Sequence, residues 1–314
     1  MATKNFLNWL LTEKGKQFSF YVAGTAITGI MVASYTSQTI FINNYKDLFR
    51  LYKNGVAAPV PGILKERFEK TLQLLEIEEA ERQLYSPFMS CGFDIIGLGL
   101  SSSRFGVYIG LPSNFQYNSP QNFDTSKIVL NQAEGKSVTW DSKEGQDLLN
   151  SMVLSEKAQL YAIAKEIQFR QSPKLYIDTF IATSCAAATY ILSSIINRKF
   201  DFYSRPRVIR LIVYSFVSSL CFMNFIMCKD MSQLYYEKTS DDYLIAKDPV
   251  FLEGGKEFWE KILKRNMALR KLLGPRGESM YTITGNENNI IRSKHLPFTE
   301  RQSFFANKAA PSVN

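Results

Sequence analysis

Three stretches of the chain contain no Asp, Glu, Lys or Arg, and they limit its fold more than any other feature. They cover residues 17–45, 179–197 and 211–228, and are 29, 19 and 18 residues long. About 20 mainly apolar residues in a helix cross the hydrocarbon core of a bilayer, so each stretch is long enough for a transmembrane helix. The first has no cleavage site after a compact apolar core and is interpreted as an uncleaved anchor rather than a signal peptide. For the other two, core helices of a soluble protein stay an alternative.

The predicted membrane helices are rich in small residues. Ala186, Ala187 and Ala188 form a block in the second, and Gly24 and Gly29 lie in the first. Small residues allow helices to approach closely in lipid, where packing drives association. We therefore predict that these positions pack helices together.

Basic residues predict the topology. The segment between the second and third spans has one acid, Asp201, and the five basic residues Arg198, Lys199, Arg205, Arg207 and Arg210. Lys4, Lys14 and Lys16 precede the first span. Because Lys and Arg in short loops mark the side from which a protein is inserted, three spans place both basic segments on one side. They account for most of the net charge of +8, and no nucleic-acid recognition motif accompanies it.

The chain has one histidine, His295, and four widely spaced cysteines. A helix-borne zinc peptidase site requires two histidines four residues apart and a third ligand. A catalytic triad would have to use His295 as its base. We expect no catalytic residue, no metal site and no cofactor.

The region between the first two spans predicts a mixed α/β domain. Helical periodicity follows Pro61 to about residue 83, and glycine-punctuated β-type runs follow from 85 to 115. A hairpin is predicted at 127–140, and helices at 142–152 and 155–170. We interpret 155–170 as amphipathic and lying at the membrane surface. A further amphipathic helix is predicted at 256–273, ended by Gly274-Pro275.

Several segments together resemble the transmembrane protein 177 family. The resemblance is carried by GGKEFWEKILKRNMALRKLLGPRGESMYTITGN (254–286) and RSKHLPFTERQSF (292–304), and by VTWDSKEGQDLLNSM (138–152) and LSEKAQLYAIAKEIQF (154–169). It implies a mitochondrial inner-membrane protein that acts in cytochrome c oxidase biogenesis. It also implies association with newly made subunit 2 and with the membrane chaperone that stabilises that subunit.

A more distant resemblance is to integral-membrane gluzincins of the HtpX and CAAX-protease type. The order of hairpin, helix, transmembrane hairpin and late His-Pro motif is similar. In this chain Lys165 and Phe169 replace the two ligand histidines, while Glu166 stands at the general base. Asp242 falls near the acidic ligand, and His295 and Arg301 bound the late motif. The resemblance implies a peptidase scaffold without zinc.

We therefore expect an α+β integral membrane protein, mainly helical, with three transmembrane helices and a domain resembling a zinc-less gluzincin. Its predicted function is that of a non-catalytic assembly factor, with no nucleic acid or small-molecule substrate. The alternatives are a membrane-bound hydrolase with an unrecognised site and, ranked last, a small transporter. The predicted parts are a matrix-side N-terminus (1–16), spans at 17–42, 178–197 and 211–228, a matrix-side basic loop (198–210), an intermembrane-space domain (43–177 and 229–301) and a disordered tail (302–314).

Overall fold

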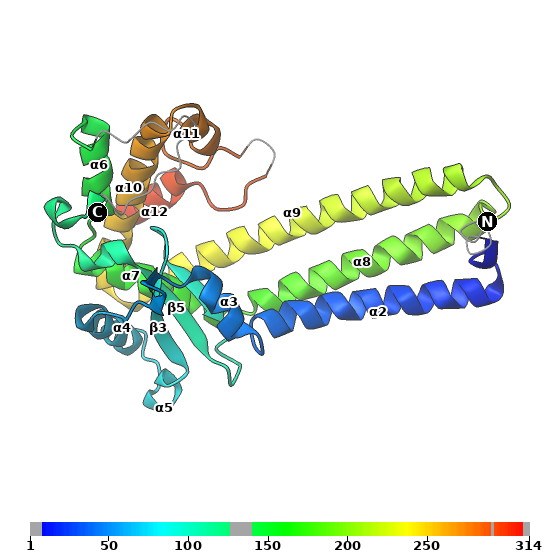
Figure 1. Cartoon of the computed structure of the whole chain (residues 1–314), viewed down its shortest axis with the longest axis horizontal. Coiled ribbons are helices and arrows are strands. Elements are labelled where there is room, and N and C mark those ends of the chain that lie inside the picture. The colour runs from blue at the N-terminus through cyan, green and yellow to red at the C-terminus, as the bar shows by residue number, and fades with distance from the viewer. Residues whose placement is uncertain (1–7, 126–139, 290–291, 310–314) are drawn as a thin grey trace, which may run out of the picture. The chain divides into compact units, whose positions relative to one another are not determined.

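The computed structural model describes residues 8–125, 140–289 and 292–309. The chain divides into two units. Unit 1 comprises Met1–Ser37 and Pro173–Gln233, and unit 2 comprises Gln38–Ser172 and Leu234–Asn314. Figure 1 shows that long helices make up the first unit, and that the second combines helices with a small sheet.

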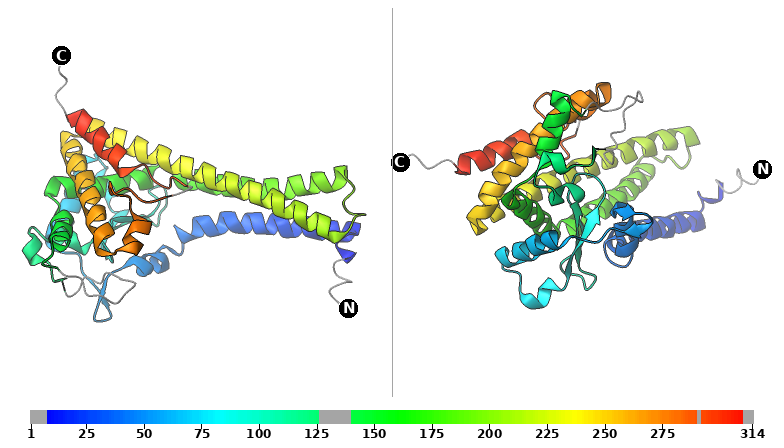
Figure 2. Two further views of the ribbon diagram at one scale, coloured as in Figure 1. Left: turned by 90° about the horizontal axis from the view of Figure 1, so that it is seen from above. Right: turned by 60° about the vertical axis from the view of Figure 1, so that its left-hand side comes forward.

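Unit 1 is built from α2 (Glu13–Ser37), α8 (Lys174–Lys199) and the first part of α9 (Arg207–Lys247). Helices α2 and α8 lie side by side (Figures 1 and 2). The Asn197 side-chain amide donates to the Tyr214 hydroxyl over 2.6 Å. The Ser232 hydroxyl donates to the Asp178 carboxylate over 2.9 Å. These bonds join α8 to α9.

The apolar helices of unit 1 have the length and composition of membrane spans. Their most apolar windows have mean hydropathies of 1.3, 1.6 and 1.9, and only 0%, 0% and 6% of those windows is buried in protein. Core helices of a soluble protein would bury these residues. The three helices are therefore membrane spans, which confirms an α+β membrane protein.

Two of these helices end at other residues than the predicted spans. Helix α2 ends at Ser37, and the rest of the charge-free run forms a turn and the start of α3 (Ile42–Phe49), where Ile42 is buried. Helix α9 continues through the charged residues Lys229 and Asp230 to Lys247. Charged residues are unfavourable in the hydrocarbon core, but they do not interrupt a helix. The charge-free run therefore marks only the membrane-spanning part of α9.

Unit 2 contains a three-stranded sheet in the order β3 (Tyr85–Ser90), β5 (Val107–Pro112) and β4 (Ile96–Gly99). Strand β5 pairs parallel with β3 and antiparallel with β4. A separate two-stranded ribbon joins β1 (Tyr52–Lys53) to β2 (Val56–Ala57). The predicted hairpin at 127–140 lies almost wholly outside the described residues.

Helices and short 3₁₀ turns surround this sheet. Serine side chains cap two of the helices: the Ser142 and Ser155 hydroxyls accept from the amides of Gly145 and Ala158. The remaining elements of unit 2 are α4 (Gly62–Leu74), α5 (Glu79–Arg82), η1 (Ser113–Gln116), η2 (Pro120–Asn122), α6 (Lys143–Met152), α7 (Glu156–Gln171), α10 (Pro249–Leu272), α11 (Pro275–Met280) and α12 (Phe298–Ala309).

Helix α7 is the centre of unit 2, and the prediction that it is amphipathic is wrong. Every residue from Ala158 to Ala164 is buried, so this stretch has no solvated face. It packs against α4, α10 and the sheet. Because alanine at three of these positions lets neighbours approach from several sides, the segment is buried all round.

The predicted disordered tail also needs correction. Residues 302–309 belong to α12, in which Phe305 is fully buried. Its ring lies 5.1 Å from that of Tyr161, edge to face. The burial of one large aromatic side chain contributes roughly 1.5–3 kcal/mol, which helps to hold this short helix in place.

Candidate functional site

Two buried carboxylates on α9 form the base of the candidate site. Glu237 and Asp241 are four residues apart, so they face the same side of the helix. They are 6% and 2% exposed. Buried carboxylates need partners that offset the loss of hydration, and here the partners come from α7, α12 and the segment before α12.

Arg301 of α12 is the main partner of Asp241. Its Nε and one terminal nitrogen each lie 2.8 Å from a carboxylate oxygen, in a bidentate pair. A second terminal nitrogen lies 3.5 Å from Glu237. The guanidinium also lies over the Trp259 ring, 3.9 Å from its centroid. Burial lowers the pKa of Arg301, but the Asp241 carboxylate and its neighbours outweigh burial, and the net pKa is raised.

Tyr161 extends the cluster into α7. Its hydroxyl donates to Asp241 over 2.7 Å and accepts from the Trp259 indole N–H over 2.8 Å. Burial, followed by the Asp241 carboxylate, raises the pKa of Tyr161 well above its ordinary value. The hydroxyl therefore stays protonated and acts as a fixed hydrogen-bond donor.

His295 closes the cluster at the surface. Its Nδ1 lies 2.5 Å from Glu237, whose second oxygen accepts from the Leu296 amide over 2.9 Å. The hydrogen bond to Glu237, against the opposing effect of burial, raises the pKa of His295. Two carboxylates and one guanidinium leave a single negative charge, which protonated His295 neutralises.

The pKa shift of His295 predicts a pH dependence of stability. A folded-state pKa above the unfolded value gives a stabilisation that is complete below about pH 6.5 and lost as pH rises through the folded value. We expect the melting temperature of the full-length protein to exceed that of His295→Asn most below about pH 6.5, with the difference narrowing as pH rises above that range. Thermal unfolding in detergent across this range measures it. Lys294→Gln, a change at an exposed neighbour, should differ from the wild type in melting temperature by the same amount at every pH. A difference for His295→Asn that widens as pH rises would contradict the raised pKa of His295.

Only some of the residues that align with the gluzincin motifs lie near the buried cluster. Lys165 lies 5.7 Å from the Trp259 ring centroid, and its charge acts on His295. Its Nζ pairs with Glu166 at 3.0 Å. Glu166 lies against β4, because a Cβ on Gly97 would come within 2.9 Å of its Oε2. Phe169 lies one turn further along α7, where the Arg170 guanidinium covers its ring.

Asp242 does not belong to the cluster, contrary to the predicted placement. It is exposed, since it is turned by about 100° around α9 from Asp241. Glu237 and Asp241 take the positions that face His295 and Arg301. The sequence feature that could have identified Glu237 and Asp241 is their E-x-x-x-D spacing within one helix. Tyr161 and Trp259, which the sequence reasoning also missed, carry no comparable local signal.

Among the described residues, no group of three His, Cys, Asp or Glu side chains is arranged to hold a metal ion. The Glu237 and Asp241 carboxylates instead accept hydrogen bonds from His295, Arg301 and Tyr161. The arrangement couples α7, α9 and α12 into one buried network.

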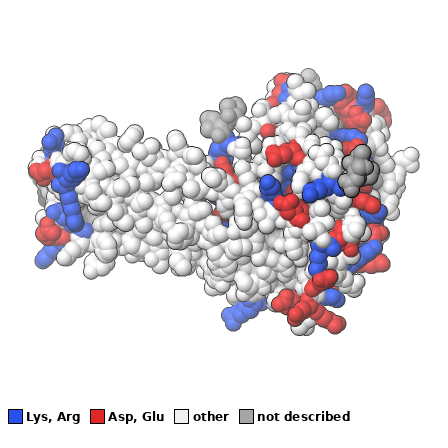
Figure 3. All heavy atoms as spheres, turned by 180° about the vertical axis from the view of Figure 1, so that it is seen from behind, with Lys and Arg blue, Asp and Glu red and all other residues white. Residues whose placement is uncertain are grey.

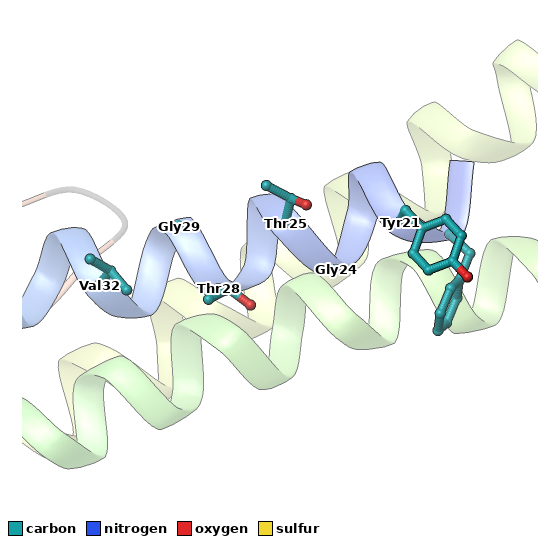
Figure 4. A pocket seen from close by; sticks show the side chains of 7 residues that line it. Tyr21, Gly24, Thr25, Thr28, Gly29 and Val32 are labelled. Carbon is teal, nitrogen blue, oxygen red and sulfur yellow. The ribbon is translucent and has the colours of Figure 1, made fainter. Parts of the chain in front are cut away.

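The small residues of the spans, predicted to pack helices together, do not all lie at contacts within the chain. Ala186, Ala187 and Ala188 are half-buried on α8, the helix that packs against α2. Gly24 and Gly29 meet open space, because a Cβ on either would have no atom within 4 Å. Figure 4 shows them in a shallow recess along α2, whose lining is Phe20, Tyr21, Gly24, Thr25, Thr28, Gly29 and Val32.

The three apolar helices and the mixed unit 2 define an α+β integral membrane protein. The chain belongs to the Transmembrane protein 177 family, whose model matches residues 10–296. It is 26% identical to Transmembrane protein 177 of Xenopus laevis, over 95% of this chain and 96% of the relative. It is 29% identical to the Homo sapiens protein of that name over 81% of each chain, and 29% identical to that of Danio rerio over 84% and 85%. No solved structure matches the chain.

Proposed function

We propose that this protein is a non-catalytic assembly factor for cytochrome c oxidase in the mitochondrial inner membrane. It would bind and stabilise newly made subunit 2 and the membrane chaperone of that subunit. The observation that carries the proposal is the match to the Transmembrane protein 177 family over residues 10–296, because resemblance to that family implies this role.

Two features of the structure support a partner-binding role in the membrane. The apolar windows of the three spans are almost entirely unburied within the chain. The recess around Gly24 and Gly29 is also open. A second transmembrane helix can approach closely at such small residues, where van der Waals packing drives association. By the charge rule, the N-terminus and the basic loop would lie in the matrix and unit 2 in the intermembrane space.

A first test changes the small residues of the spans. Replacing Ala186, Ala187 and Ala188 with leucine should weaken co-purification of subunit 2 and its chaperone without abolishing membrane insertion. Because α8 also packs against α2, the Gly24→Leu/Gly29→Leu variant is the sharper one: it adds side chains in the recess, where a Cβ at either position would meet no atom within 4 Å. Quantitative mass spectrometry of proteins purified with a tagged bait should show a roughly tenfold or greater loss of both partners.

The matched control is Ser218→Leu/Ser219→Leu, which adds the same side chains at exposed positions of α9. It should retain both partners. Unchanged recovery of the partners with both small-residue variants would contradict the packing role. Their absence from a correctly inserted wild-type bait would contradict the proposed function itself.

We also propose that unit 2 is a pseudoenzyme domain. Lys165 and Phe169 stand where a related peptidase would have ligand histidines, and Glu237 accepts hydrogen bonds from His295 and Leu296. Elemental analysis of the purified full-length protein should find far less than one zinc per chain. A value near one would favour the membrane-bound hydrolase.

A further inference from the structure

One end of unit 1 gathers a large excess of positive charge. The residues there are the start of α2 and the connection between α8 and α9. They comprise the acids Glu13 and Asp201 and the basic residues Lys14, Lys16, Arg198, Lys199, Arg205, Arg207 and Arg210. Figure 3 shows these blue and red side chains at the tip, next to a broad band without charge.

Three interactions hold the two segments of this end together. The Arg207 guanidinium donates to the Asn8 side chain. The Lys16 ammonium lies over the Tyr203 ring, 4.9 Å from its centroid. Arg198 interacts electrostatically with Glu13. The basic residues, though about 190 positions apart in the sequence, therefore form one surface, which we call the basic end.

The acidic residues of the basic end are already engaged. Glu13 pairs with Lys16 at 2.7 Å. Asp201 accepts from the Ser204 hydroxyl over 2.7 Å. The Nε of Arg210 is buried and, among the described residues, has no hydrogen-bond partner. The structure thus leaves both positive charge and hydrogen-bond donors for an anion.

The position of the basic end indicates where that anion lies. Arg210 directly precedes the charge-free part of α9, and Arg198 directly follows that of α8. Phe200 and Phe202 stack at 5.6 Å between them, and Phe200 is 52% exposed. Aromatic and basic residues at the ends of membrane helices lie at the headgroup level of the bilayer. Helix α9 also begins here, so its free amide groups and positive dipole end face the same level.

We propose that the basic end binds the phosphodiester headgroup of an anionic phospholipid. Arginine fits a phosphate through two parallel hydrogen bonds, and the lipid's acyl chains would lie along the apolar faces of α8 and α9. A bound lipid of this kind neutralises charge that the chain itself leaves uncompensated. The site lies in unit 1 alone and does not depend on which partner the spans bind.

The test uses the full-length protein in bilayer nanodiscs that contain equal amounts of phosphatidylcholine and phosphatidylglycerol. Native mass spectrometry after release into detergent counts the lipids that remain bound. We expect the wild type to retain phosphatidylglycerol roughly tenfold over phosphatidylcholine, since each basic side chain near an anionic headgroup favours it several-fold. Equal retention of the two lipids would overturn the proposal.

Two variants and a control locate the site. Arg205→Gln/Arg207→Gln/Arg210→Gln should lose the preference. Changing the same three residues to lysine keeps the charge that directs insertion but removes bidentate binding, so it should retain a reduced preference. Lys65→Gln/Lys256→Gln/Lys294→Gln removes three exposed charges of unit 2 and should behave as wild type. A preference that survives in the glutamine variant, or is lost in the unit 2 control, would refute the location.

A competition arm separates a lipid from a free anion. Excess inorganic phosphate should not displace the bound phosphatidylglycerol, because the acyl chains contribute to its binding. Complete displacement by phosphate would identify an anion site and overturn the assignment to a lipid.

Discussion

Arg301→Met is expected to lower the free energy of unfolding by about 3–5 kcal/mol. The change preserves most of the side-chain volume but leaves Asp241 buried without a cationic partner, and it leaves Glu237 with His295 alone. It also removes the charge that lies over the Trp259 ring. A buried carboxylate without a cationic partner is either charged and poorly compensated for its lost hydration, or it takes up a proton, and both outcomes weaken the folded state.

Chemical unfolding of the full-length protein in detergent, followed by tryptophan fluorescence, measures this change. Arg104→Met makes the same replacement at an exposed position and should alter stability by no more than about 0.5 kcal/mol. Adding Asp241→Asn to Arg301→Met should restore part of the loss, since it removes one uncompensated charge. A loss below about 1 kcal/mol for Arg301→Met would show that the pair is not buried as the structure has it.

This network shows what the sequence could and could not predict. The spans are set by local composition, and the α6 and α7 caps by single serines, so both could be predicted from short windows. The partners of Arg301 could not, because they lie about 60 residues away on a helix whose continuation beyond the membrane carries no local signal. The choice between Asp241 and Asp242 depends on the rotation of α9, which only tertiary contacts determine.

The burial of α7 is a second case of this kind. Its sequence contains polar residues such as Gln159 and Lys165, which suggested a solvated face. The structure satisfies Gln159 internally: its amide donates to the carbonyls of Phe115 and Leu154 over 3.1 Å, and its oxygen accepts from Arg67 over 2.7 Å. Polar residues in a buried helix are tolerated when each group has a partner, so polarity alone could not locate the surface.

Gly254→Ala is expected to have the second large effect, a loss of about 3 kcal/mol or more. A Cβ at Gly254 would lie 2.1 Å from the backbone carbonyl oxygen of Lys157. Because that atom belongs to the central helix α7, it cannot move aside as the end of a flexible side chain would. Helices α7 and α10 would have to separate, and the separation would disturb the bond between Tyr161 and Trp259 that crosses the same interface.

Two further glycine changes make the prediction specific. Gly62→Ala adds the same methyl group at the start of α4, where no atom lies within 4 Å, and should be neutral or slightly stabilising. Gly255→Ala would meet the Phe305 ring at 2.3 Å, and should give an intermediate loss because that ring can shift together with α12. Unfolding curves of the three full-length variants, measured under the same conditions, test this order. If Gly254→Ala proved as stable as Gly62→Ala, the close approach of α7 and α10 would be wrong, and the geometry of the buried network that depends on it would have to be revised.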